Sequence, residues 1–279
     1  MEKRDREIIP KKSLFDLNLN QIWKFKDLLF LFVWRDFVSV YKQTLLGPLW
    51  FFIQPILTSI TFTIIFGNFA QISTDGMPKI IFYMAGITMW NYFADCLNKT
   101  SNTFVVNQGL FGKVYFPRLI VPLSIIVTNL LKFGIQIVLF MGFWVYFYAT
   151  TDTLESNWYV LTFPLLVLIM AALGLGFGMV ISALTTKYRD LTFLIGFGVQ
   201  LLMYGSPVIY PMSTVPEKYQ WIIKLNPMTS IIDTFKHAFM GTGSFDGYNL
   251  LYSGIFAVCI LFLGLVVFNK VEKSFIDTV

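Results

Sequence analysis

The sequence predicts an all-α polytopic membrane protein, and its composition and apolar stretches both point to this class. Of the 279 residues, 56% are hydrophobic and only 13% are charged, whereas a typical soluble domain has about 25% charged residues. Because so few side chains can face water, most of the surface is expected to face lipid. Six stretches are long and apolar enough to cross a hydrocarbon core of about 30 Å as helices; they are 49–70, 80–98, 120–149, 158–184, 191–210 and 250–269.

The N-terminal part, 1–47, is predicted to stay on one side of the membrane. Residues 1–21 are charged and polar, so no cleaved signal peptide is expected. The apolar run within 27–37 is too short to span a bilayer, and on a helix its neighbourhood gives one apolar stripe: Ile22, Phe25, Leu29, Val33, Phe37 and Val40. This pattern predicts an amphipathic helix that lies in the membrane interface. A short transmembrane helix is the alternative, which the charges of Arg35 and Asp36 disfavour.

Gly47 and Pro48 stand between this interface helix and the first predicted span. Glycine accepts backbone conformations that other residues avoid, and proline in the first turn of a helix loses no hydrogen bond. The pair is therefore predicted to be a hinge.

Lysine and arginine residues are concentrated on one side of the predicted membrane. Sixteen of the 21 fall in the N-terminal part, in the loops 99–118 and 185–190, and in the tail. Cytoplasmic loops carry such an excess, so both termini are expected in the cytoplasm. The predicted organisation is a cytoplasmic N-terminus (1–47), a transmembrane domain (48–270) and a cytoplasmic tail (271–279).

The segment 205–244 between spans five and six is too apolar for a plain loop and too broken for a span. Asn226 and Pro227 fit the N-cap and first position of a helix that Gly241 would end. A second short helix is expected at 216–225. Two such helices at the outer face resemble a re-entrant cap or gate, which should border a pathway; its candidate residues are Pro207, Tyr210, Trp221, Asn226 and Pro227.

No motif for catalysis or for metal binding is found in the sequence. Cys96 and Cys259 are not expected to form a disulfide or a metal site, and His237 has no His or Cys partner within a turn. No phosphate-binding P-loop is present, so a pump of this kind would need energy from a partner chain. Asp95 and Lys132 fall inside predicted spans, where a functional and a structural role both remain open.

The cytoplasmic segment 107–118 is predicted to be a docking surface with a short helix. Apolar side chains are expected to be exposed near Lys113 and Arg118; they are Leu110, Phe111, Tyr115 and Phe116. Apolar and aromatic residues beside a few cations are typical of protein interfaces. The alternative, that these side chains dip into the membrane interface, stays open.

Four stretches carry a family resemblance. They are YKQTLLGPLWFFIQP (41–55), GKVYFPRLIVPLS (112–124), KYRDL (187–191) and NPMTSIIDTFKHAFMG (226–241). In this order they resemble the ABC-2 type permeases that export polysaccharides and polyol phosphates. Those proteins are the transmembrane subunits of O-antigen, capsule and teichoic acid exporters, and the likeness covers nearly the whole chain.

The resemblance implies a homodimer in the bacterial inner membrane with two copies of a separate nucleotide-binding ATPase subunit, which binds the ATP and magnesium. It implies a glycan on an undecaprenyl diphosphate lipid, such as the O-antigen of lipopolysaccharide biosynthesis, exported from the cytoplasmic side. No cofactor of its own and no nucleic-acid partner are implied. The helices at 216–225 and 227–240 would form the periplasmic gate. The residues that would contact the ATPase are Arg35, Asp36, Tyr41, Lys42, Asn107, Leu110, Phe111, Tyr115 and Phe116.

A glycan chain would slide along aromatic side chains, because sugar rings have apolar faces that stack on them and many weak sites favour conduction. The candidates are Trp90, Tyr92, Phe93, Trp144, Tyr146 and Tyr204. For each of them lipid contact or helix packing is the alternative, and Trp144, Tyr146 and Tyr148 fit an interfacial belt better. Lys113 and Arg118 are expected to meet the lipid diphosphate, with ATPase docking as their competing role.

Three alternative functions compete with glycan export. An ABC-2 permease for a small molecule shares the fold and the partner. A membrane-embedded glycosyl or acyl transferase is disfavoured because no catalytic constellation is found in the sequence. A scaffold protein is disfavoured because the broken outer segment indicates a pathway.

Overall fold

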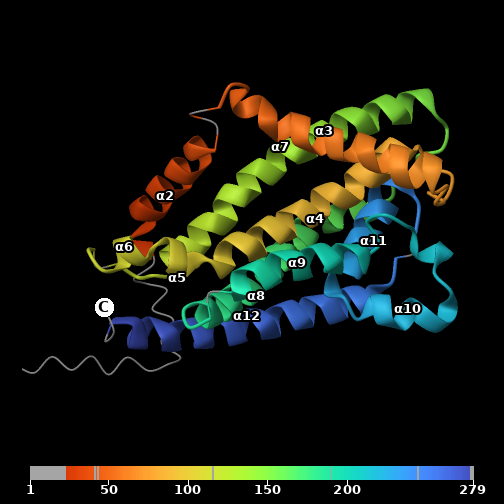
Figure 1. The fold of residues 1–279 in the computed structure, drawn as a ribbon. Helices are drawn as coiled ribbons and strands as arrows, with labels where there is room; N and C mark the ends of the chain where they lie inside the picture. Colours follow the sequence, from red (N-terminus) through yellow and green to blue (C-terminus); the bar gives the residue numbers. More distant parts are fainter. Residues whose placement is uncertain are drawn as a thin grey trace, which may run out of the picture.

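The computed structural model describes residues 23–276 apart from 41, 43, 115, 189 and 244, and of 273–276 it describes the backbone alone. All regular elements in this part are helical (Figure 1). The α-helices are α2 (Lys26–Ser39), α3 (Trp50–Phe62), α4 (Lys79–Ser101), α5 (Thr103–Val106), α6 (Gln108–Phe111), α7 (Ile120–Thr150), α8 (Phe163–Thr185), α9 (Leu191–Tyr204), α10 (Glu217–Lys224), α11 (Pro227–Met240) and α12 (Gly247–Ile276).

Two of the long helices begin or end in other helical forms. A 3-10 turn at Gly47–Leu49 leads into α3, and a π-helix at Thr63–Phe69 follows it. A second 3-10 turn, Trp158–Thr162, precedes α8. Among the described residues, four continuous helical stretches are long and apolar enough to cross a membrane: Gly47–Phe69, Ile120–Thr150, Trp158–Thr185 and Gly247–Glu272. The chain is therefore a multi-pass membrane protein.

The long helices run lengthwise beside one another, and the shorter ones gather at the two ends of the bundle (Figure 1). Helices α2, α5 and α6 lie at one end, which we call the α2 end. Helices α10 and α11 lie at the other, the α10 end. Helix α2 slants alongside the first part of α7 and packs on it.

Helix α8 lies between α4 and α12, and glycines bring the three backbones close together. A Cβ atom on Gly174 would lie 2.6 Å from Cys96 Cβ of α4, and one on Gly178 would lie 2.4 Å from Thr100 Cβ. On the other side of α8, a Cβ on Gly176 would lie 2.7 Å from the Leu261 nitrogen of α12. Such small residues allow close helix packing in membrane proteins.

The two short helices predicted within 205–244 are confirmed as helices. Asn226 caps α11, since its side-chain oxygen accepts a hydrogen bond of 3.0 Å from the Met228 amide. Pro227 is its first residue, and Gly241 ends it with a φ of 72°. The predicted fifth span, 191–210, was too long, because α9 ends at Tyr204 where Gly205 and Pro207 interrupt the helix.

The apolar stripe predicted on the interface helix is found in part. Phe25 and Leu29 are half-buried and Val33 is buried, whereas Val40 is exposed and Ile22 lies outside the described residues. Phe32, next to this stripe, joins a buried aromatic cluster at the α2 end with Phe104, Phe111, Phe116 and Phe268. The opposite face of α2 leaves Phe30, Leu31 and Trp34 more than half exposed.

Candidate functional site

The link between α9 and α10 is a buried stretch of non-helical backbone. Ser206, Pro207, Val208 and Ile209 are all buried, and a Cβ added to Gly86 of α4 would lie 3.0 Å from the Val208 Cα atom. Non-helical backbone inside a membrane protein requires partners for its polar groups. We call residues 205–212 the buried link.

Lys236 of α11 supplies one of those partners. Its side chain is only 2% exposed, and its ammonium donates a hydrogen bond of 2.6 Å to the Pro207 carbonyl. The same ammonium lies 3.4 Å from the ring centroid of Phe82, a favourable cation–π geometry. Asn226 also donates to the buried link, through a 3.4 Å hydrogen bond to the Gly205 carbonyl.

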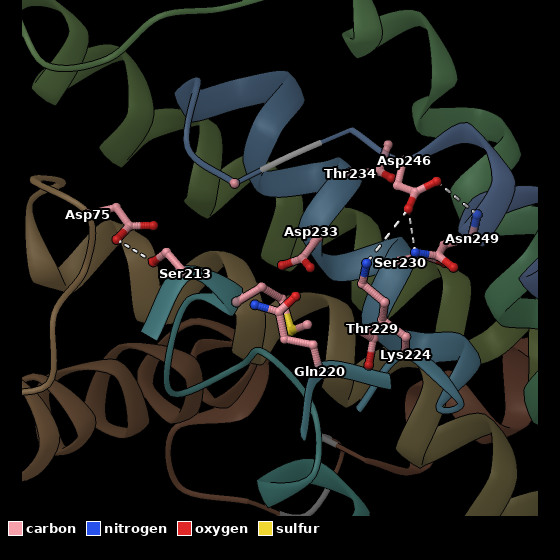
Figure 2. Close-up of a pocket in the computed structure, with 12 residues that line it drawn as sticks. Asp75, Ser213, Gln220, Lys224, Thr229, Ser230, Asp233, Thr234, Asp246 and Asn249 are labelled. Carbon is pink, nitrogen blue, oxygen red and sulfur yellow. Dashed lines mark hydrogen bonds and ion pairs between the residues drawn. The ribbon is translucent and has the colours of Figure 1, made fainter. Parts of the chain in front are cut away.

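A polar cavity of about 340 Å³ lies beside the buried link (Figure 2). Gln220 and Lys224 come from α10, Asp233 from α11, and Asp246 and Asn249 from the start of α12. Figure 2 shows Asp233 with its carboxylate turned toward the centre of this group. Other hydroxyl and carboxylate groups complete the lining: Asp75, Ser213, Thr229, Ser230 and Thr234. We call this space the outer cavity.

Most charges of the outer cavity have partners within it. Asp246 Oδ2 accepts a 2.6 Å hydrogen bond from Asn249 and lies 3.8 Å from the Lys224 ammonium. Asp75 accepts a 2.7 Å hydrogen bond from Ser213. Asp233 differs: burial raises the pKa of its carboxyl, against the opposing positive charge of Lys236. Burial likewise lowers the pKa of Lys236, against the charge of Asp233.

The lining of the outer cavity can bind hydroxyl-rich ligands. Its lining combines carboxylate, amide and hydroxyl groups, which bind hydroxyls by accepting and donating hydrogen bonds. Within the described part of the chain, no group of three His, Cys, Asp or Glu side chains could hold a metal ion.

At the α2 end, the segment 107–118 turns its two phenylalanine side chains inward. Phe111 and Phe116 are 7% and 5% exposed, because they pack against each other with ring centroids 5.9 Å apart. The prediction that these two rings are exposed was wrong. The exposed apolar side chains nearby include Val106 and Val114 instead.

Arg118 is also drawn into the protein. Its guanidinium donates a 3.1 Å hydrogen bond to the Glu272 carbonyl of α12 and lies 5.3 Å from the Phe111 ring centroid. Burial lowers the pKa of Arg118, and Glu272 opposes this shift. Lys113 is exposed. The role of the two cations in lipid loading stays a prediction.

Sequence similarity to known proteins identifies the family of this chain. The family model described as ABC-2 type transporter matches residues 27–240, from α2 to the end of α11. This chain belongs to the ABC-2 type transporter family. An O-antigen export system permease protein RfbA of Klebsiella pneumoniae is 28% identical over 252 residues, 90% of this chain and 94% of that protein.

More distant ABC-2 relatives align over similar lengths. The RfbA protein of Myxococcus xanthus is 25% identical over 94% of this chain and 98% of its own length. The polysialic acid transport protein KpsM of Escherichia coli is 25% identical over 88% of this chain and 93% of its own length. Because the relatives are permeases and transport proteins, the chain is a transport subunit of the ABC-2 type.

In this ABC-2 chain the predicted pathway aromatics differ in their exposure. Trp90, Tyr92 and Phe93 are at most 3% exposed, packed in the core of α4. Neighbouring helices cover these three side chains, as the helix-packing alternative expects. Their role on a glycan pathway stays a prediction. Tyr204 at the end of α9 is 46% exposed.

The aromatic residues near the end of α7 have mixed roles. The Trp144 indole donates a 2.6 Å hydrogen bond to the Phe239 carbonyl of α11, which ties α7 to that helix. Tyr146 and Tyr148 are more than half exposed, as residues of an interfacial belt would be. Whether they face lipid stays a prediction.

The remaining predicted residues divide between the two ends of the ABC-2 chain. Arg35 and Asp36 form an ion pair of 2.7 Å on α2, while Tyr41 and Tyr115 lie outside the described residues. Lys42 is exposed and Asn107 half-buried; of the gate candidates, Pro207, Asn226 and Pro227 are buried and Trp221 is exposed. Tyr210 donates a 3.1 Å hydrogen bond to the Tyr204 carbonyl across the buried link.

Sequence reasoning missed the residues that matter most at the α10 end. Neither Lys236 nor Asp233 is among the candidate residues predicted for the segment 205–244. A signal was available: on a helix that begins at Pro227, Ile232, Lys236 and Met240 recur at a spacing of four with apolar neighbours, which places the lysine on the buried face.

Proposed function

We propose that the chain is the transmembrane subunit of an ATP-driven exporter that moves a lipid-linked polysaccharide, such as O-antigen, from the cytoplasm across the inner membrane. The observation that carries this proposal is the likeness to an O-antigen export permease over nine-tenths of the chain. The polar outer cavity supports it, because hydroxyl-rich chains need such hydrogen-bonding groups.

In this proposal the membrane is crossed six times, by α3, α4, α7, α8, α9 and α12. The α2 end faces the cytoplasm, where the excess of lysine and arginine supports it. Helix α2 lies in the interface, since it is too short to span the bilayer and exposes Phe30, Leu31 and Trp34. Residues 1–47 and 271–279 are cytoplasmic, 48–270 form the transmembrane domain, and α10 and α11 form the outer gate.

The energy comes from a partner in the proposed exporter. Two copies of an ATPase subunit, which bind the ATP and magnesium, join a homodimer of this chain. The glycan is carried on undecaprenyl diphosphate and reaches the complex from the cytoplasmic leaflet. In this proposal Lys113, which is exposed, makes first contact with the diphosphate. Arg118 supports the loop that carries Lys113 through its hydrogen bond to α12.

The ATPase docking surface is proposed to lie on α5, α6 and the turn that follows. Val106 is 75% exposed and Val114 is 53% exposed, with Lys113 beside them. Apolar side chains in the centre of an interface supply much of the binding energy.

Val106→Asp is expected to weaken co-purification of the ATPase subunit about tenfold, because a carboxylate would be buried unpaired in the interface. Co-expression with the ATPase subunit and quantitative pull-down measure this. Gln108→Asp is the control, because it adds the same charge nearby at an exposed polar position. Comparing the two variants tests whether the apolar contact of Val106 matters. Wild-type recovery of the ATPase with Val106→Asp would contradict this docking surface.

The hinge at Gly47 provides a separate prediction. Its φ is +52°, and no atom lies within 4 Å of an added Cβ, so a substitution acts through the backbone alone. Gly47→Val is expected to strain this left-handed conformation by about 1–2 kcal/mol and to lower the glycan exported per ATP hydrolysed more than it lowers membrane insertion.

Gly47→Asn is the matched control, since asparagine tolerates the left-handed region. Both variants are reconstituted with the ATPase subunit in vesicles, and export and hydrolysis are measured together. An equal loss of insertion and coupling in Gly47→Val would make the bend merely structural.

The proposed function itself is tested by gene deletion and complementation. We expect loss of surface polysaccharide with accumulation of the lipid-linked chain inside the cell, restored by this chain only when its ATPase partner is present. In a purified complex, lipid-linked glycan should stimulate ATP hydrolysis. Stimulation by a small drug and not by the glycan would instead indicate a small-molecule exporter.

A further inference from the structure

A second polar cavity, of about 200 Å³, lies at the α2 end between α2, α4 and α7. Asp36 and Ser39 border it from α2, Lys99 from α4, and Asn129 and Lys132 from α7. We call it the lysine cavity. It is separate from the outer cavity, which shares none of its residues.

Two lysines face this cavity, and only one has close partners. The Lys99 ammonium donates a 2.9 Å hydrogen bond to the Asn129 side-chain oxygen and lies 3.6 Å from Asp95. The Lys132 ammonium has no acceptor at hydrogen-bonding distance among the described residues. It is near enough to Lys99 for the two positive charges to repel each other, and Asp95 and Asp36 attract it more weakly.

The carboxylates around the lysine cavity are already engaged with other cations. Asp36 forms a 2.7 Å ion pair with Arg35, and Asp95 lies beside Lys99. The cluster therefore contains three cations and two carboxylates, and the uncompensated charge belongs to Lys132. Two ammonium groups that line one cavity repel each other, and a shared counter-ion would relieve this repulsion.

The position of the lysine cavity indicates the source of that counter-ion. Lys99 lies two residues before the end of α4 at Ser101, and its hydrogen bond to Asn129 places the first third of α7 at the same level. Helix α2, which exposes apolar side chains, borders the cavity. This is the depth at which lipid headgroups meet a helix end.

We propose that the lysine cavity binds the phosphate of a lipid headgroup, with Lys99 and Lys132 sharing its charge and the Asn129 amide and Thr128 hydroxyl positioned beside them. Lysine binds phosphate as a point charge, and a phosphate between the two ammonium groups removes their repulsion. The proposal rests on the proposed function only for one possible source, the diphosphate of the lipid carrier. An anionic phospholipid of the membrane is the other source.

The test uses the full-length chain in detergent, titrated with farnesyl diphosphate, dioleoyl phosphatidic acid, inorganic diphosphate and, as a neutral control, dioleoylglycerol. We expect Lys132→Met to weaken binding of the phosphate-bearing lipids at least tenfold, and Lys132→Arg to stay within about threefold of wild type. Lys187→Met, which removes an exposed lysine near Tyr188, is expected to bind as wild type.

Asp36→Asn keeps the test decisive if Lys132→Met fails to fold. Removing this carboxylate leaves the cavity more positive, so phosphate binding should tighten about threefold and remain salt-sensitive. Tighter binding of farnesyl diphosphate than of phosphatidic acid would assign the cavity to the lipid carrier, and equal binding would assign it to phosphate-bearing lipids in general.

Wild-type phosphate binding by Lys132→Met, or equal binding of dioleoylglycerol, would overturn the proposal. Binding is measured without transport, so the two proposals fail separately. A Lys132→Met chain that binds and exports normally refutes the lysine cavity and leaves the exporter intact. Specific phosphate binding by a chain that exports no glycan refutes the exporter instead.

Discussion

Gly176→Val is expected to prevent accumulation of the folded protein. A Cβ atom at this position would lie 2.7 Å from the Leu261 nitrogen and 2.8 Å from the Ile260 carbonyl carbon of α12. These are backbone atoms, so α8 and α12 would have to separate. Overpacking of this kind destabilises by about 3 kcal/mol or more, a large share of the 5–15 kcal/mol that typically holds a protein folded.

The measurement is the yield of monodisperse protein in detergent and its midpoint of thermal unfolding. Gly142→Val is the matched control, because Gly142 lies in α7 with open space where its Cβ would go. Gly264→Val should behave as Gly176→Val does, since its Cβ would lie 2.6 Å from the Gly176 carbonyl oxygen. Equal yields for Gly176→Val and Gly142→Val would contradict the close packing of α8 and α12.

Lys236→Ala is expected to loosen the packing at the α10 end, with an effect on stability second only to that of Gly176→Val. The substitution leaves the buried Pro207 carbonyl without its 2.6 Å hydrogen bond. It also removes the positive charge that acts most strongly on Asp233. Breaking a buried charged interaction destabilises by about 3 kcal/mol. We expect faster proteolysis of the buried link and a lower midpoint of thermal unfolding.

Three further variants separate charge from volume. Lys236→Met keeps most of the side-chain volume, so its deficit relative to wild type reports the lost hydrogen bond and charge. Combining it with Asp233→Asn is expected to recover part of the stability, because no carboxylate is then left at position 233 without a counter-charge. Lys218→Ala on the exposed side of α10 should change nothing. If Lys236→Ala unfolds as Lys218→Ala does, Lys236 does not hold the buried link.

Local signals predicted the helices better than they predicted which side chains are covered. Asn226, Pro227 and Gly241 determine the ends of α11 through their own backbone chemistry, and such signals can be read from a few neighbouring residues. The exposure of Phe111 could not be read in this way. Its burial depends on Phe104 and Phe116, and on the fold that brings α12 beside them.

The two charge arrangements also depend on contacts between distant segments. Lys236 and Pro207 are separated by 29 residues, and Lys99 and Asn129 by 30. Periodicity places each lysine on a face of its own helix, but only the packing of the helices decides what that face meets. Lys132 could therefore be marked as unusual from the sequence, while its neighbour Lys99 could not be assigned to it.

The early end of α9 has a consequence for the surrounding lipid. Its 14 residues correspond to about 21 Å of helix, against a hydrocarbon core of about 30 Å. If α9 crosses the membrane as proposed, one of two adjustments is required. Either the bilayer beside α9 becomes thinner, or the exposed side chains of α10 enter its outer leaflet; they are Tyr219, Trp221 and Ile222. The hydrophobic thickness of the protein would then be smaller beside α9 than elsewhere, and the lipid at this position would contact the proposed gate.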